Sequence, residues 1–357
     1  MPPEGAAFAV LRISLIVSNF GTSSVNALTE NLFSIPSFIF IILLSNNVAS
    51  YIIYIKHLKG AIQMIGDMQK WTPNVAGIIE HAREIHPKTE IISRLVSGEI
   101  HRSNYEKVCI RSRKLASALE KDGVKKGDVI ATLALNTYRH LEMYYGISGM
   151  GAITHTLNFR LHPEQAVYII NHAEDKIIFV ELPFVPILEA LQENLKTVEK
   201  YVVLCEVDEM PETTLKNAIS YEEYIQDGDE NYSWPTLEDD AACALCYTSG
   251  TTGNPKGVLY SHKSNVIHAQ AALTAMTIKP DDTILMVVPL FHVLAWGIPY
   301  FGPMNGLKLV MPGMQMEGEP LFELIDQEDV TLAFGVPTIW MGLLAYCRDN
   351  NLSLIHI

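Results

Sequence analysis

Apolar runs of strand length alternate with longer segments of helical spacing along most of this chain. Four runs between residues 129 and 205 predict strands: Val129–Leu135, Ala152–Thr156, Lys176–Val180 and Tyr201–Cys205. The segments between them predict helices: Tyr138–Ile147, Pro163–Asn171 and Pro183–Leu195. Apolar strands separated by helices indicate a mostly parallel sheet covered on both faces. The pattern therefore predicts an α/β fold.

The same alternation returns after residue 241. Its predicted strands are Ala241–Cys246, Val258–Tyr260, Thr283–Val288, Leu307–Met311 and Thr331–Phe334. Helices are predicted over Lys263–Met276, over Leu321–Gln327 and after Pro337. Before residue 129, Asn74–Ile85 predicts a helix and Ser97-Gly98 predicts a hairpin turn between two strands. Ser103 with Glu106 then has the spacing of a capping box, which predicts a helix start.

An acidic segment divides these two series. Residues 221–240 hold eight acids and no lysine or arginine, which indicates a solvated linker. We therefore expect a first α/β subdomain over 68–220, the linker over 221–240, and a second α/β subdomain over 241–351. Residues 1–67 and 352–357 follow neither series.

The N-terminal segment 1–67 contains an uncharged stretch, residues 31–55, that is long enough to span a bilayer. Lys56 and Lys59 follow it as a cytoplasmic flank would, but Pro36 and several polar residues interrupt it. Three interpretations remain open: a membrane anchor, an amphiphilic targeting extension, or a wrongly assigned coding start. We favour the last, because the regular pattern begins abruptly near Met68.

Charge and cysteine content narrow the function classes. The net charge of −14 argues against nucleic-acid binding, which needs a basic patch. The five cysteines are scattered through apolar runs, so no disulfide framework is implied and a reducing compartment fits. Cys243 and Cys246 form a CxxC, but no second ligand pair accompanies them. We interpret both as small buried apolar residues.

A glycine-rich segment stands between two of the predicted strands. It reads YTSGTTGNPKGV over residues 247–258. Glycines allow the backbone to turn tightly and approach a ligand, and backbone N–H groups in such a loop form an anion-binding concavity. Hydroxyls and Lys256 add donors, which together suit a phosphate chain. It is not a Walker loop, because Pro255 replaces the second glycine and Gly257 replaces the hydroxyl.

YTSGTTGNPKGV resembles the phosphate-binding signature of the adenylate-forming superfamily, which includes acyl-CoA synthetases, luciferases and peptide-synthetase adenylation domains. PLFHVLAW over 289–296 and GVPTIW over 335–340 resemble two further signatures of acyl-CoA synthetases. The resemblance covers about Met68 to Asn351. It is strongest to medium- or long-chain fatty-acyl and methylthiopropionyl CoA ligases.

The resemblance implies site residues. Phosphate-binding positions are Thr248, Ser249, Gly250, Thr251, Thr252, Gly253 and Lys256, with Thr251 as the Mg²⁺ contact. Lys256 and His292 are the implied catalytic residues, and His292 contacts nucleotide and acyl group. Residues that line the acyl pocket are Trp296, Val336, Pro337 and Thr338. Trp296 stands at the gate of the fatty-acyl tunnel and favours an aliphatic acid.

The implied activity is the ATP-dependent conversion of an aliphatic carboxylic acid to an acyl-adenylate and then to acyl-CoA, with ATP, Mg²⁺ and coenzyme A as cofactors and no nucleic-acid partner. A homodimer and a cytoplasmic location fit the family. A mitochondrial or membrane-associated location would require the N-terminal extension, and membrane contact would require residues 31–55.

The family's motifs that follow GVPT do not occur here. The resemblance therefore implies that the second sheet is incomplete, that the C-terminal lid domain with its catalytic lysine is absent, and that this chain alone is inactive. Two alternatives stay open: a non-catalytic remnant that binds nucleotide or acyl groups, and an adenylation domain that serves a carrier protein.

Asn136 and Asn158 each follow a predicted strand. In α/β folds, ligands bind beyond the carboxyl ends of such strands. Asparagine also commonly caps a following helix or closes a turn. We favour the capping interpretation for both residues.

Overall fold

The computed structural model describes residues 71–248 and 254–353. The expected extension 1–67, with its uncharged stretch 31–55, and most of the segment 352–357 lie outside these ranges. Within the described ranges, no helix combines the length and apolarity needed to cross a membrane. The α/β class predicted from the sequence is confirmed, with two mostly parallel sheets.

The larger sheet has seven strands in the order β7-β6-β5-β3-β4-β8-β9. Its strands are β3 (Val129–Leu133), β4 (Ile153–Thr156), β5 (Ile177–Val180), β6 (Lys200–Val203), β7 (Ala218–Ser220), β8 (Ala242–Thr248) and β9 (Lys256–Ser261). All neighbours pair in parallel except β8 and β9, which pair antiparallel at one edge. Most of its strands are buried and apolar, as expected for strands covered on both faces.

The smaller sheet has five strands in the order β12-β10-β11-β1-β2. Its strands are β1 (Glu90–Arg94), β2 (Ile100–Asn104), β10 (Thr283–Met286), β11 (Lys308–Met311) and β12 (Leu332–Phe334). The predicted hairpin is confirmed as the antiparallel pair β1–β2, and β1 pairs in parallel with β11.

The two sheets do not follow the division of the chain at residues 221–240. The hairpin β1–β2 precedes that segment and joins the strands that follow it. Conversely, β8 and β9 follow the segment and join the strands that precede it. Each sheet therefore contains strands from both sides of residues 221–240, and the two sheets share a core.

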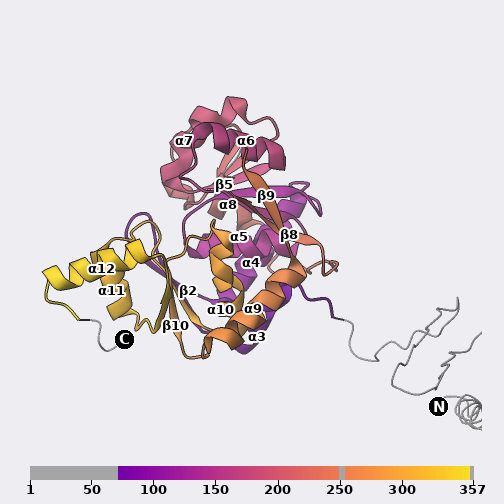
Figure 1. The fold of residues 1–357 in the computed structure, drawn as a ribbon. Coiled ribbons are helices and arrows are strands. Elements are labelled where there is room, and N and C mark those ends of the chain that lie inside the picture. Colours follow the sequence, from indigo (N-terminus) through magenta and orange to yellow (C-terminus); the bar gives the residue numbers. More distant parts are fainter. Residues whose placement is uncertain (1–70, 249–253, 354–357) are drawn as a thin grey trace, which may run out of the picture. The chain divides into compact units, whose positions relative to one another are not determined.

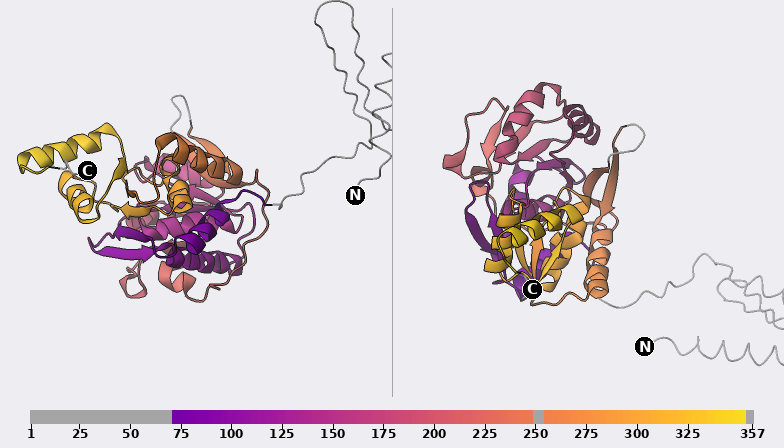
Figure 2. Two further views of the ribbon diagram at one scale, coloured as in Figure 1. Left: turned by 90° about the horizontal axis from the view of Figure 1, so that it is seen from below. Right: turned by 60° about the vertical axis from the view of Figure 1, so that its left-hand side comes forward.

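Helices form three layers around the two sheets (Figure 1). One outer layer is α6 (Pro163–Ala173) and α7 (Val185–Leu191), packed on the seven-stranded sheet. The other is α11 (Gly318–Gln327) and α12 (Pro337–Asp349), packed on the five-stranded sheet. Figure 2 shows this yellow pair together at one end. The middle layer is α3 (Val75–Ile85), α4 (Tyr105–Lys121), α5 (Tyr138–Gly149), α8 (Tyr221–Gln226), α9 (His262–Met276) and α10 (Ile298–Asn305).

One local prediction, the helix cap at Ser103, is wrong by one residue. Ser103 does not cap α4, because β2 continues through it and Ser103 pairs with Ile91. The cap is Asn104, whose side chain accepts a hydrogen bond from the Lys107 N–H at 2.9 Å.

The acidic segment 221–240 is not solvated throughout. It begins with α8, in which Tyr221 is fully buried. Glu222 in the same helix pairs with the guanidinium of Arg111 at 2.8 Å and that of Arg139 at 3.0 Å. Its negative charge is therefore compensated inside the fold.

Candidate functional site

The two strands predicted on either side of the glycine-rich segment are present as β8 and β9. Paired residues run up to Thr248 and Lys256, so β8 and β9 form a ladder that reaches the base of the loop. The Thr248 hydroxyl donates to the Lys256 carbonyl at 3.4 Å. Five predicted phosphate-binding residues lie outside the described residues: Ser249, Gly250, Thr251, Thr252 and Gly253.

Lys256 stands at the end of this ladder with its side chain exposed. Among the described residues, no carboxylate pairs with its ammonium group. By contrast, the ammonium of Lys263 at the start of α9 lies 2.6 Å from Asp239. Lys256 therefore offers an uncompensated positive charge beside the loop, as phosphate binding requires.

Tyr247 lies near the end of β8, at the base of the phosphate loop, and connects this strand to α6. Burial raises the pKa of Tyr247 to about 12, so the hydroxyl stays protonated. That hydroxyl lies 2.6 Å from Nδ1 of His172 in α6, and we assign it as the donor. Gly257 lies opposite the ring, where a Cβ would come within 3.2 Å of Tyr247 Cζ and 3.0 Å of a Leu245 methyl. The glycine thus allows the two strands to pack closely around the tyrosine.

His292 follows β10, in the connection to α10. Its imidazole is exposed, and among the described residues no side chain hydrogen-bonds to it. Its backbone N–H donates to the Pro289 carbonyl at 2.9 Å, which closes a turn. The ring is therefore presented to solvent by a fixed backbone and is free to contact a ligand.

The four residues that follow His292 have an unusual backbone. Val293, Leu294, Ala295 and Trp296 all have positive φ, between 44° and 56°, and Gly297 follows with φ of 83°. We call residues 293–297 the left-handed turn. L-residues rarely adopt this conformation, and such residues cluster at functional sites. Gly297 also lies against His268 of α9, because a Cβ there would come within 2.5 Å of the imidazole Nδ1.

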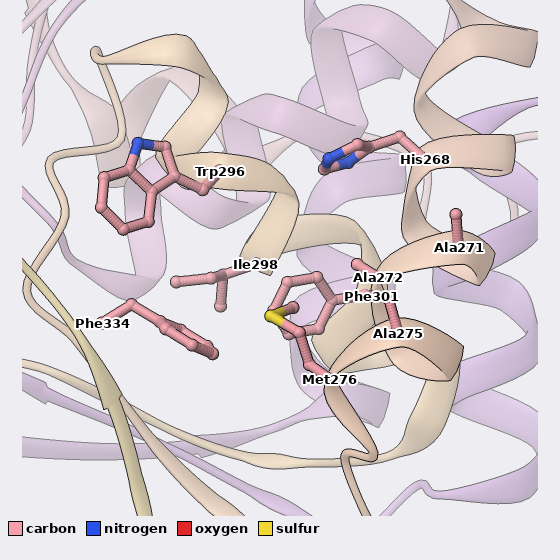
Figure 3. Close-up of a pocket in the computed structure, with 9 residues that line it drawn as sticks. All are labelled: His268, Ala271, Ala272, Ala275, Met276, Trp296, Ile298, Phe301 and Phe334. Atoms are coloured by element: carbon pink, nitrogen blue, oxygen red, sulfur yellow. The ribbon is translucent and has the colours of Figure 1, made fainter.

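Trp296 of this turn lies at one side of a pocket of about 400 Å³ (Figure 3). The pocket is almost entirely apolar. Its lining residues come from α9, α10, β12 and the left-handed turn: His268, Ala271, Ala272, Ala275, Met276, Trp296, Ile298, Phe301 and Phe334. Its size and lining suit an aliphatic chain or an aromatic ring. The sequence interpretation identified Trp296 but missed the α9 wall, because His268 and its alanines carry no motif.

The other predicted acyl-pocket residues lie close to the pocket in the chain but do not line it. Val336 is half exposed, and Pro337 and Thr338 begin α12. Phe334, two residues before Val336, is the lining residue from this segment. Since Phe334 pairs with Met286 of β10, the segment 335–338 leaves the sheet beside the connection that carries His292.

Thr156 links the two motif-bearing loops. It lies at the carboxyl end of β4 and pairs with Cys246 of β8, just before the phosphate loop. Its hydroxyl donates to the Phe291 carbonyl, immediately before His292, at 3.3 Å. We call residues 286–292, from the end of β10 to the left-handed turn, the His292 loop. The seven-stranded sheet thus brings the base of the phosphate loop and the His292 loop to one place. Cys243 and Cys246 are both buried, as predicted for small apolar side chains.

The two asparagines have different roles. Asn158 closes a local turn, with its carbonyl oxygen accepting from the Arg160 N–H at 2.9 Å, as predicted. Asn136 caps nothing. Instead, its side chain donates to the carbonyls of Met286 and Val288, in the other sheet. The capping interpretation of Asn136 is wrong because its partners lie about 150 residues away in the chain.

Comparisons with known proteins show the family of the chain. The family model described as "AMP-binding enzyme" matches residues 79–354. A medium-chain-fatty-acid–CoA ligase from Ectopseudomonas oleovorans is 46% identical over 290 residues, covering 81% of this chain and 53% of the relative. A 3-methylmercaptopropionyl-CoA ligase from Ruegeria pomeroyi is 44% identical over 293 residues, covering 82% of this chain and 54% of the relative.

Among solved structures, a long-chain-fatty-acid-CoA ligase from Archaeoglobus fulgidus superposes with a TM-score of 0.68 at 23% identity, covering 80% of this chain and 56% of that one. This likeness concerns the fold alone. The chain spans about half the length of the curated relatives that it matches.

Proposed function

We propose that this chain, which belongs to the AMP-binding enzyme family, supplies the ATP- and carboxylate-binding site of an acid–thiol ligase for aliphatic acids. One observation carries the proposal. The exposed Lys256 begins β9 at the base of the phosphate loop, and the exposed His292 lies on a loop that Thr156 ties to the neighbouring strand β8. The left-handed turn after His292 leads to an apolar pocket. Such a site has places for a phosphate chain, a reacting carboxylate and an apolar tail.

The proposed reaction has two steps. In the first, a carboxylate oxygen attacks the α-phosphorus of ATP, the bond to the β-phosphate oxygen breaks, and pyrophosphate leaves. In the second, the sulfur of coenzyme A attacks the carbonyl carbon of the acyl-adenylate. The bond to the phosphate oxygen of AMP then breaks, and the thiol proton passes to solvent. Both steps move negative charge onto phosphate oxygens, so positioned cations and N–H donors lower the barrier.

Lys256 would bind the phosphates through its ammonium group, with the Thr248 hydroxyl and the loop amides beside it. A cation that already pairs with a carboxylate would lose that partner on binding. The lack of a carboxylate partner for Lys256 within the described part of the chain therefore favours this role. The assignment of residues 249–253 to the β- and γ-phosphates, and of Thr251 to Mg²⁺, rests on the family resemblance. Mg²⁺ would offset phosphate charge when bound.

The pocket supports an aliphatic acid as the substrate class. Three aromatic rings and the Met276 and Ile298 side chains surround it, and His268 is its single titratable member. A chain of methylene groups gains about 0.8 kcal/mol per buried group in such a place. The relatives named as medium-chain and long-chain fatty-acid ligases agree with this choice.

The test is carboxylate-dependent exchange of labelled pyrophosphate into ATP, with acids of increasing chain length. It compares the chain with Lys256→Ala and with Lys263→Ala, a neighbouring exposed lysine that already has an ion pair. The expected result is exchange that requires an aliphatic acid and Lys256 but tolerates the loss of Lys263. It would also overturn the expectation that the chain alone is inactive.

Two other outcomes separate the alternatives. Binding of Mg·ATP that Lys256→Ala weakens, without exchange, would favour the non-catalytic nucleotide-binding remnant. Pyrophosphate exchange together with transfer of the acyl group to a carrier protein, in preference to coenzyme A, would favour the adenylation domain. If the folded chain shows no Mg·ATP binding and no exchange, the proposed function is contradicted.

A further inference from the structure

One buried side chain uses all its hydrogen-bonding groups on a single stretch of the His292 loop. Both N–H groups of the Asn136 carboxamide donate, to the Met286 carbonyl at 2.7 Å and the Val288 carbonyl at 2.8 Å. Its oxygen accepts from the Leu290 N–H at 2.8 Å. Asn136 is only 2% exposed. Because a primary amide offers two donor hydrogens and a carbonyl, no other side chain of this size could satisfy the same three groups.

The backbone of Asn136 is itself held on several sides. Its carbonyl accepts from the Gly313 N–H, after β11, at 3.2 Å. The preceding residue, Leu135, donates its N–H to Glu181 at 3.2 Å and accepts from His140 Nδ1 at 3.0 Å. Asn136 is therefore a fixed point at the carboxyl end of β3, to which the His292 loop is attached.

Two more hydroxyls from the same side hold the loop. Tyr144 of α5 donates to the Leu290 carbonyl, and Thr156 of β4 donates to the Phe291 carbonyl at 3.3 Å. Together with Asn136, they bind the backbone from Met286 to Phe291. Asn136 follows β3 and Thr156 ends β4 in the seven-stranded sheet, and Tyr144 comes from the middle helix layer, whereas the loop follows β10 of the five-stranded sheet.

The bonded stretch ends one residue before His292 and two before the left-handed turn. Four consecutive non-glycine residues with positive φ are unfavourable by themselves, so their surroundings must fix them. The hydrogen bonds from Asn136 fix the entry to this turn, and the contact between Gly297 and His268 fixes its exit. The orientation of both His292 and Trp296 depends on this backbone.

We propose that Asn136 is a positioning residue for the candidate site: it holds the His292 loop and the left-handed turn against the seven-stranded sheet, so that His292 faces the bound nucleotide. The consequence for ligand binding rests on the proposed function, whereas the consequence for the loop's conformation does not. Asn136 acts through the backbone of residues 286–290 and touches no ligand.

The conformational test uses ¹⁹F NMR of the chain labelled with fluorotryptophan. The chain has four tryptophans, and a Trp296→Phe variant assigns the resonance of the turn. In Asn136→Ala we expect the Trp296 resonance to shift or broaden while those of Trp71, Trp234 and Trp340 stay in place. Tyr144→Phe removes one hydroxyl and one hydrogen bond, so it should change the same resonance by less.

The functional test is a double-mutant cycle on the affinity for octanoyl sulfamoyl-adenosine, a stable analogue of an acyl-adenylate, measured by calorimetry. Asn136→Ala should weaken binding by about tenfold in the wild-type background, as misplacement of a binding group does. In the His292→Ala background the same substitution should weaken it by less than about twofold, because the positioned group is gone.

Tyr105→Phe is the matched control. The Tyr105 hydroxyl donates a buried hydrogen bond to the Leu307 carbonyl, just before β11 of the five-stranded sheet, at 2.7 Å. This bond lies away from the His292 loop. It should leave the Trp296 resonance unchanged. An unmoved Trp296 resonance in Asn136→Ala would overturn the proposal, as would equal movement of all four resonances. If the analogue binds neither to the wild type nor to any variant, the proposed function is refuted. The NMR result then decides the positioning role.

Discussion

The two loops of the candidate site are built in opposite ways. The phosphate-loop motif is flanked by a strand ladder at a sheet edge, and the flanking residues Thr248 and Lys256 are exposed. The His292 loop is attached by the side chains of Asn136 after β3, Tyr144 of α5 and Thr156 of β4, and it continues into a turn of unfavourable backbone. The first loop carries its chemistry in its own sequence. The second owes its shape to residues far away in the chain.

This difference has a consequence for mutations. Substitutions in the phosphate loop should change ligand binding without changing the stability of the fold. Substitutions that affect the His292 loop should change both, because its supports are buried. Stability and affinity measured on the same variants therefore distinguish the two designs.

The largest expected effect is on stability and concerns His140, which supports the residue before Asn136. Burial lowers the pKa of His140 from 6.5 to about 4. Between these values the unfolded state binds the extra proton, so the free energy of unfolding should fall as the pH falls from about 6.5 to about 4, by up to about 3 kcal/mol. Urea unfolding at several pH values should show this loss in the wild type relative to His140→Gln.

Glu181, the other support of Leu135, should titrate with the opposite sign. Burial raises its pKa from 4.5 to about 7. The folded state then binds the extra proton, so the free energy of unfolding should fall as the pH rises from about 4.5 to about 7. The pH ranges of the two titrations overlap. The contribution of each residue is therefore measured as the difference in free energy of unfolding between the wild type and its variant, His140→Gln or Glu181→Gln. Parallel pH curves for wild type and both variants would contradict these assignments.

The next effect concerns affinity at the phosphate loop. Lys256→Ala should weaken Mg·ATP binding by about 10- to 150-fold, since a hydrogen bond to a charged group contributes about 1.5–3 kcal/mol. Calorimetric titration measures the affinity. Thermal unfolding should stay unchanged, because the side chain is exposed and unpaired among the described residues. A large loss of stability would place Lys256 in the structural framework instead.

A smaller stability effect is expected at the exit of the left-handed turn. Gly297→Ala should lower the free energy of unfolding by about 2 kcal/mol, since alanine is strained at φ of 83° and its Cβ would meet His268. Gly342 in α12 is the control, because a Cβ there meets nothing within 4 Å. Gly342→Ala should stabilise by up to about 1 kcal/mol. Equal effects at the two glycines would refute the turn geometry.

The smallest effect concerns the acyl pocket. Trp296→Ala removes one wall and should weaken binding of an octanoyl analogue by about tenfold, or about 1.4 kcal/mol, with little change for an acetyl analogue. Paired titrations with the two analogues measure the ratio. A uniform loss for both analogues would indicate that Trp296 contacts the shared nucleotide part.

The sequence predicted the features that depend on local pattern. The strands β3 to β6 and β8 to β12 and most of the helices follow from apolar periodicity. The phosphate-binding role of residues 249–253 stays a prediction, because these residues lie outside the described ranges. One boundary failed at Ser103, because the pairing of β2 with β1 continues one residue further than the cap pattern indicates.

Features that depend on distant partners were not predictable. Nothing local states that β1 pairs with β11, or that Asn136 binds residues 286–290. The left-handed turn contains only one glycine, so its backbone carries no sequence signal. Asn136 and Asn158 have the same local context and differ only in what the fold brings next to them.

The most direct test of the account is whether the His292 loop and the apolar pocket form one site. It measures the affinity of the chain for acyl sulfamoyl-adenosines whose acyl groups range from acetyl to dodecanoyl. The account predicts that affinity rises with each added methylene until the pocket is full, by up to about 0.8 kcal/mol per group. The rise should persist at a lower overall affinity in His292→Ala and flatten in Trp296→Ala. Affinity independent of chain length in the wild type would contradict the account.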